Sequence, residues 1–125
     1  MFLAEYQSKE VLAQYGVAVP DGRQARSPDE AQRLCKEIDA HKYVVKAQIG
    51  AGGRGLAGGI RFAATPSAVA QEAGRLLGDV LVTDQTGLAG ETVDLVLVEA
   101  AIDIVQSCFV AIALAPSDGA PMLLA

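Results

Sequence analysis

The glycine-rich segment 50–59, Gly-Ala-Gly-Gly-Arg-Gly-Leu-Ala-Gly-Gly, constrains this chain more than any other feature. It follows an apolar run, 43–45, which leads directly into Lys46. Because glycine has no Cβ, successive backbone N–H groups can point into one concavity and approach a ligand closely. Lys46 adds a mobile charge beside this loop, and Arg54 adds a second charge within it. The alternative is a plain spacer between two strands, which would gain nothing from a lysine in an apolar setting. The pattern therefore favours a phosphate-binding loop.

The glycine spacing does not match the two commonest phosphate loops. The segment lacks the Gly-Lys-Ser/Thr ending of a P-loop. Gly50, Gly52 and Gly55 satisfy the G-x-G-x-x-G pattern, but a dinucleotide fold needs a helix directly after the third glycine. Residues 58–63 instead alternate between apolar and polar, which predicts a strand. The sequence therefore predicts a hairpin flap over a nucleotide.

Composition places the chain among globular proteins. It has 125 residues, of which 51% are hydrophobic and 20% charged, enough for one ordinary domain or part of a larger one. The net charge of −5 argues against a nucleic-acid partner. Residues 1–7 carry an early acid and no basic region before an apolar core, so they do not resemble a signal peptide, and no apolar run reaches membrane-spanning length. We expect a soluble, cytoplasmic protein with no membrane contact, or a protein of the mitochondrial matrix in a eukaryote.

The cysteines and the histidine do not suggest a metal centre. Cys35 falls on the apolar face of an expected helix and Cys108 in an expected strand, so we expect both to be reduced thiols in the core. His41 lies in a polar connection and is expected at the surface. No metal site built on His and Cys is predicted.

Three helices are expected, at residues 4–15, 27–38 and 65–77. The last two begin with Ser27-Pro28 and Thr65-Pro66, where a capping side chain precedes a proline at the first helical position. Apolar residues then recur at helical spacing in both. In the first helix we expect packing by four apolar or aromatic side chains, Tyr6, Val11, Leu12 and Tyr15.

Strands are expected between and after these helices. Their ranges are 23–26, 43–48, 59–64, 81–83, 93–99, 108–115 and 122–125. The last range stops in mid-strand, with no turn or charged tail, so we expect that the sequence is cut from a longer protein.

Several motifs in order resemble one family over residues 1–125. The family is the β subunit of succinyl-CoA synthetase, the ADP-forming succinate–CoA ligase, of which the chain resembles the N-terminal third. The matching stretches are Glu5-Tyr-Gln-Ser-Lys-Glu10, Val44-Val-Lys-Ala-Gln48, 51–55 with 57–59, Leu81-Val-Thr83 with Gln85-Thr-Gly87, and Leu97-Val-Glu-Ala100. A series of separate motifs in register is far more specific than a single glycine pattern.

The resemblance implies an α/β fold, the N-terminal portion of an ATP-grasp fold with a mixed sheet and flanking helices. It also implies a division of the chain. Residues 1–20 would begin the second ATP-grasp lobe, 21–102 would form the nucleotide-binding lobe with the flap 50–59, and 103–125 would begin the following lobe, apparently truncated.

The resemblance also implies roles for individual positions. Lys46 would bind phosphate, Gly53-Arg54-Gly55 would form the flap contact, and Glu99 with the backbone near Ile102 would line the hinge that holds the base. Ser107 stands where the family usually has an acid that contacts the nucleotide. Pro20 resembles the ATP-preferring type, although ATP and GTP preference stays open. The cofactors would be ATP and magnesium, with the metal ligands outside this segment; no catalytic or metal-binding residue is assigned within it.

In this family the nucleotide exchanges its γ-phosphate with a phosphohistidine on a partner α subunit. Succinate then forms an acyl phosphate that coenzyme A captures. His41 is not expected to be that phosphohistidine, and the segment by itself is expected to be inactive. Two alternatives stay open: a related malate–CoA ligase or citrate-cleaving subunit, and a non-catalytic nucleotide-binding or assembly module.

The chain departs from the family pattern near the expected anion site. Gly50 stands where histidine is common, Leu56 where lysine is usual, Asp79-Val80 where Lys-Arg is common, and Ser107 where an acid is usual. Cations are thus lost, and each well-placed charge-assisted contact to phosphate contributes about 1.5–3 kcal/mol. One hypothesis is that nucleotide affinity or acid choice is altered; the alternative is neutral drift at exposed positions.

Overall fold

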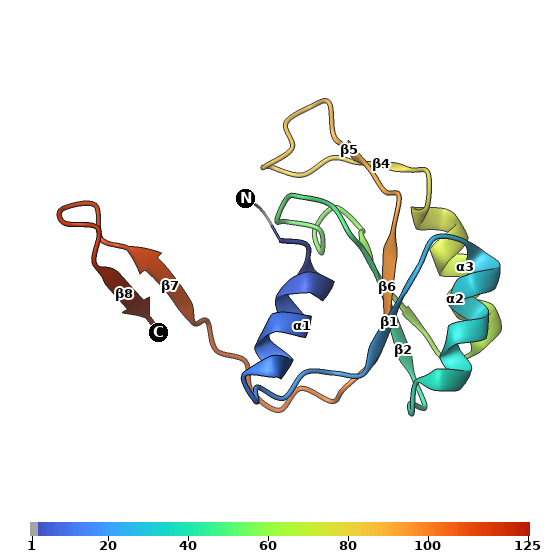
Figure 1. Cartoon of the computed structure of the whole chain (residues 1–125). Helices are drawn as coiled ribbons and strands as arrows, with labels where there is room; N and C mark the ends of the chain where they lie inside the picture. The colour runs from blue at the N-terminus through green and yellow to red at the C-terminus, as the bar shows by residue number, and fades with distance from the viewer. Residues whose placement is uncertain (1–2) are drawn as a thin grey trace.

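A computed structural model describes residues 3–125 as a small α+β lobe followed by a projecting hairpin (Figure 1). Met1 and Phe2, the first residues of the segment 1–7 that does not resemble a signal peptide, lie outside the described residues. The helices are α1 (Glu5–Gln14), α2 (Pro28–Leu34), which continues as a 3₁₀ turn (Cys35–Glu37), and α3 (Pro66–Leu76). The strands are β1 (Gly22–Ala25), β2 (Tyr43–Ala47), β3 (Ile60–Ala63), β4 (Val80–Leu81), β5 (Glu91–Thr92), β6 (Val96–Ala100), β7 (Ala111–Leu114) and β8 (Pro121–Leu124).

The main sheet has the strand order β1-β6-β2-β3. All of its neighbouring strands pair in antiparallel fashion, for example with Val45 opposite Val98 in the β2–β6 pair. The α/β class with flanking helices is confirmed, but the mixed sheet that we expected is wrong. The reason is that β1 and β2 run in the same direction, joined by α2, while β6 lies between them and opposes both. A parallel contact therefore does not form within the described sheet.

Local capping signals set the starts of α2 and α3, as predicted. The Ser27 side chain accepts a hydrogen bond from the Glu30 N–H at 3.2 Å, and Thr65 accepts one from the Ala68 N–H at 3.2 Å. Both helices cover one face of the sheet (Figure 1), where they bury the side chains Ala31, Val69, Ala73 and Leu76 against the central strands. Burial of these apolar groups holds the lobe together and fixes the position of β2.

Helix α1 lies on the opposite face of the sheet and is attached differently (Figure 1). Within the described part of the chain, α1 has no buried residue. Of the four side chains that we expected to pack, three are exposed, Val11 by 43%, Leu12 by 46% and Tyr15 by 83%, and Tyr6 is half-buried. The prediction of an apolar docking face for this helix is therefore wrong. Its attachment is polar, through the residues described in the next subsection.

The hairpin of β7 and β8 projects from the lobe (Figure 1). Its strand β7 is shorter than the predicted 108–115, and all four residues of β8 are exposed. Cys35 is buried, as predicted, but Cys108 is exposed and precedes β7, so its expected place in a core is wrong. The physical reason is that the two strands pair with each other and not with the main sheet.

Candidate functional site

Lys46 lies near the end of β2, on the sheet face that carries α1. The buried neighbours on either side, Val45 and Ala47, fix the strand, and its alternation turns Lys46 away from the core. The ammonium Nζ lies 2.8 Å from Glu5 Oε1 and 2.7 Å from Glu99 Oε2. Its side chain is 18% exposed, so these ion pairs are largely shielded from solvent.

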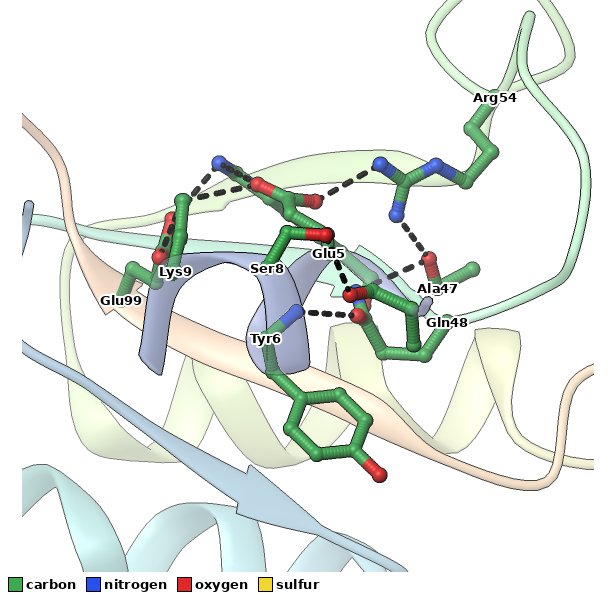
Figure 2. A network of polar contacts seen from close by, with 10 residues as sticks. Glu5, Tyr6, Ser8, Lys9, Ala47, Gln48, Arg54 and Glu99 are labelled. Carbon is green, nitrogen blue, oxygen red and sulfur yellow. Dashed lines mark hydrogen bonds and ion pairs between the residues drawn. The ribbon is translucent and has the colours of Figure 1, made fainter. Parts of the chain in front are cut away.

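Arg54 reaches the same place from the glycine-rich loop (Figure 2). One terminal nitrogen, Nη2, lies 2.8 Å from Glu5 Oε2, and Nη1 donates a hydrogen bond to the Ala47 carbonyl at 2.6 Å. Lys46 and Arg54 therefore bind the two different oxygens of one carboxylate. The sequence predicted both cations as phosphate ligands, and the structure brings them together around an anionic group.

Lys9 and Glu99 complete a group that we call the charge cluster: Glu5, Lys9, Lys46, Arg54 and Glu99. Lys9 Nζ lies 2.8 Å from Glu5 Oε1 and also pairs with Glu99 Oε1. Glu99 is 1% exposed, and its Oε2 meets the Lys46 ammonium without a well-formed hydrogen bond among the described residues. With three cations and two carboxylates, the charge cluster keeps one net positive charge.

The charge cluster shifts the pKa values of two of its members. Burial works against ionisation of Glu5, but hydrogen bonds from Lys46 and Lys9 outweigh it and lower the pKa of Glu5 to about 2. Burial also works against the charged form of Lys46, but the hydrogen bond to Glu5 and the close ion pair with Glu99 outweigh it and raise the pKa of Lys46. Both groups are charged at neutral pH.

The glycine-rich loop has the predicted form of a hairpin flap. It joins the antiparallel strands β2 and β3, and it closes with a hydrogen bond from the Ala47 N–H to the Gly59 carbonyl at 2.8 Å. Gly53 has φ +79° and Gly58 has φ +77°, a region that other residues rarely adopt. The glycines at these two positions are needed for the backbone to turn.

The flap is tied to the loop that follows β4. Gly52 N–H donates to Gln85 Oε1 at 2.7 Å, and Gly50 N–H donates to Glu91 Oε1 at 2.8 Å. A cavity of about 420 Å³ lies between the two loops, lined by residues that include Gly53, Leu56 and Thr83. Sequence reasoning missed this contact, although the Gln85-Thr-Gly87 motif marked the second loop as part of the family pattern.

Other predicted site residues lie outside the charge cluster. Gly55 and Ser107 are exposed, and Ile102 is 63% exposed. Ile102 borders a separate cavity of about 310 Å³ at the end of β6. Pro20 lines a small cavity of about 100 Å³ that Lys9 and Glu99 also line, so it lies near the charge cluster.

The departures from the family pattern also lie outside the charge cluster. Leu56 is 97% exposed on the flap, Val80 is 49% exposed, and Asp79 is exposed beside it. Gly50 is exposed with its N–H held by Glu91. The flap thus presents an exposed apolar side chain at Leu56.

Across residues 3–125, no group of three or more His, Cys, Asp and Glu side chains is placed to hold a metal ion. In the same part of the chain, none of the helices has the length and apolar character needed to cross a membrane.

Comparison with known proteins identifies the family of the chain. The ATP-grasp domain family matches residues 2–125, so the chain belongs to the ATP-grasp family, which implies ATP binding. Within that family, the chain is 47% identical over 114 residues to the β subunit of the ADP-forming succinate–CoA ligase of Bacillus pumilus, covering 91% of this chain and 30% of the relative. The same subunit from Brevibacillus brevis is 44% identical over 125 residues, covering 100% and 32%. That of Geobacillus kaustophilus is 49% identical over 110 residues, covering 88% and 28%. The chain spans about 30% of the length of these relatives.

Proposed function

We propose that this chain is the nucleotide-binding part of an acid–CoA ligase β subunit. The reaction of the whole protein would convert succinate, coenzyme A and ATP into succinyl-CoA, ADP and phosphate. The proposal rests on the ATP-grasp family and on relatives named succinate–CoA ligase β subunits. Because the chain spans about 30% of the length of those relatives, we place the substrate pocket and the contacts with the partner subunit in the rest of the protein.

One observation supports this function most directly: Lys46 and Arg54 converge on both oxygens of the Glu5 carboxylate. Two cations that hold two oxygens of one anion can equally hold two oxygens of a phosphate. The glycine-rich flap approaches the same point through Arg54, so the loop and the strand act on one ligand. This convergence is what phosphoryl transfer needs, because that chemistry depends on positioning and positive charge.

The proposed roles follow from these positions. Lys46 binds the nucleotide phosphates from the strand, Arg54 binds them from the flap, and Gly53 and Gly55 let the flap backbone come close. Glu99 holds Lys46 and, with the segment near Ile102, lies along the hinge beside the base. Magnesium would be held by ligands in the rest of the protein, and it would neutralise phosphate charge during transfer.

The wider organisation is also part of the proposal. Residues 21–102 form the nucleotide-binding lobe, residues 1–20 begin the second ATP-grasp lobe, and residues 103–125 begin the following lobe. The projection of the β7–β8 hairpin supports a boundary after β6. A partner α subunit would carry the phosphohistidine that exchanges phosphate with the nucleotide. The complex would work in the cytoplasm, or in the mitochondrial matrix of a eukaryote.

The test is nucleotide binding by the full-length protein with its partner subunit. Lys46→Met removes the cation but keeps a side chain of similar length, and Lys36→Met is the matched control because Lys36 is exposed in the turn after α2. Isothermal titration with ADP and magnesium should show a loss of about 10- to 150-fold for Lys46→Met and none for Lys36→Met. Unchanged affinity in Lys46→Met would contradict the site.

The acid substrate needs a separate assay. Turnover of the full-length complex with succinate, malate or citrate as the only acid distinguishes the ligase proposed here from its relatives. We expect the largest kcat/KM with succinate. Nucleotide binding without turnover of any of the three acids would favour a non-catalytic module instead.

A further inference from the structure

We propose that Glu5 competes with the nucleotide for the phosphate-binding cations. Its carboxylate occupies Lys46 and Arg54 until the nucleotide displaces it. This inference rests on the proposed function and adds a residue that sets nucleotide affinity. Its basis is the position of the Glu5 carboxylate, between the two side chains assigned to phosphate.

Both oxygens of Glu5 are engaged. Oε1 accepts from Lys46 at 2.8 Å and lies 2.8 Å from Lys9, while Oε2 lies 2.8 Å from Arg54. The directions in which Lys46 and Arg54 would meet phosphate oxygens are therefore taken by carboxylate oxygens. A phosphate can bind both cations in their present positions only if Glu5 moves away.

The cations keep other partners when Glu5 leaves. Lys46 retains Glu99 Oε2 at 2.7 Å, Lys9 retains Glu99 Oε1, and Arg54 retains the Ala47 carbonyl at 2.6 Å. Removal of one carboxylate raises the net charge of the charge cluster from one to two positive units. The site that remains is still ordered and more attractive to an anion.

The attachment of α1 permits such a displacement. No residue of this helix is buried in the described chain, and Val11 and Leu12 are nearly half exposed. Beyond the charge cluster, α1 is held by polar contacts such as the Tyr6 N–H to Gln48 Oε1 at 3.3 Å (Figure 2) and Gln24 Nε2 to Glu10 Oε1 at 3.0 Å. On this sheet α1 is therefore held by ion pairs and hydrogen bonds, which a competing anion can replace. Buried apolar area between α1 and the sheet would not respond to an anion.

If Glu5 is a competitor, removing its charge changes nucleotide affinity in one direction. If Glu5 is instead a structural brace, the change is in the opposite direction. A brace that positions Lys46 and Arg54 for phosphate would lower nucleotide affinity when it is removed. A competitor would raise affinity when its charge is removed. Glu5→Gln makes this distinction because it keeps the size and shape of the side chain and removes the charge.

The experiment compares Glu5→Gln with Glu10→Gln in the full-length protein with its partner subunit. Glu10 is an exposed carboxylate on the same helix, outside the charge cluster. By isothermal titration at neutral pH, Glu5→Gln should bind ADP about tenfold more tightly than the unmodified protein, and Glu10→Gln should bind it equally. Equal or weaker binding by Glu5→Gln would overturn the inference.

A second measurement needs no variant. Hydrogen exchange followed by mass spectrometry on the unmodified protein should show faster exchange in residues 5–14 when saturating ADP is present, because the nucleotide releases α1. Unchanged or slower exchange in that segment would also overturn the inference. If Lys46→Met binds ADP normally, the proposed function itself fails; if Lys46→Met is weakened and Glu5→Gln is not tighter, this inference alone fails.

Discussion

Gly52 donates its backbone N–H to the side-chain Oε1 of Gln85 at 2.7 Å, which ties the flap to the loop after β4. A glycine-rich loop without such a tie would sample many conformations, since glycine loses more backbone freedom on ordering than any other residue. The contact therefore gives Gln85 a defined role in placing the flap, together with Glu91, which holds Gly50.

Replacement of Gln85 by alanine should free the Gly52 amide. Loss of a hydrogen bond of about 1 kcal/mol corresponds to about fivefold faster amide exchange. The measurement is hydrogen exchange by NMR, and the Gly50 amide, held by Glu91, serves as an internal reference that should not change. Leu88→Ala is the matched control, because Leu88 is 98% exposed in the same loop. Equal amide exchange rates at Gly52 in Gln85→Ala and in the unmodified chain would contradict a role for the Gly52–Gln85 hydrogen bond in holding the flap.

A second prediction concerns acid stability. Glu5 has its pKa lowered from 4.5 to about 2 in the folded chain, surrounded by Lys9, Lys46 and Arg54, with Glu99 beside them. A depressed pKa stabilises the fold above the unfolded value and loses that effect as the pH falls through the folded value, so the window is about pH 4.5 to 2. The contribution at neutral pH is on the order of 3 kcal/mol.

The check is the free energy of unfolding in urea as a function of pH. The unmodified chain should lose more stability across this window than Glu5→Gln, and above it the difference between the two should be constant. Parallel curves through the whole acid range would show that Glu5 does not carry this linkage.

The flap glycines should differ in their tolerance of alanine. Gly53 has φ +79°, and a Cβ there would lie 3.3 Å from Thr83 Cβ, so Gly53→Ala should destabilise the chain by about 1–3 kcal/mol. Gly55 has no positive φ, and its Cβ would meet Ile60 Cδ1 at an ordinary 3.7 Å. Gly55→Ala should be neutral or stabilise by up to about 1 kcal/mol. Urea unfolding measures both, and equal losses would contradict this description of the loop.

Leu56 offers a test of the hypothesis that lost cations weaken nucleotide binding. It is 97% exposed and lines the cavity beside the flap. In the full-length protein, Leu56→Lys should tighten ATP binding by about two- to fivefold, the effect of one exposed ion pair. Val105→Lys, at a position that is 100% exposed in the segment before β7, controls for the added charge. The same gain from both variants would argue against a specific effect at Leu56.

Sequence reasoning succeeded where the determinants are local. The starts of α2 and α3 depend on Ser27 and Thr65 and their own first turns, so the residues that decide them are adjacent in the chain. The flap was also predictable, because a strand, a glycine loop and a second strand follow one another directly. Lys46 lies just before the flap and Arg54 lies within it, and both were identified with it.

The parts that were missed depend on contacts between distant segments. The approach of Glu5 and Lys9 to Lys46 joins a helix to a strand far along the chain, and no local pattern encodes that meeting. The Gln85 contact with Gly52 is of the same kind. For Cys108, the apolar run around it suggested burial, but its neighbouring strand pairs only within its own hairpin among the described elements.

The burial of Glu99 has a consequence for how readily the site exchanges one anion for another. Its carboxylate pairs with both Lys9 and Lys46 and is itself almost inaccessible to water. The positions of these lysines therefore do not depend on which anion occupies the solvent side of the charge cluster. Exchange of one anion for another then requires little reorganisation of the lysines. The buried side of the site, Glu99 with its two lysines, is preorganised. Movement is confined to Glu5 on α1 and to the flap.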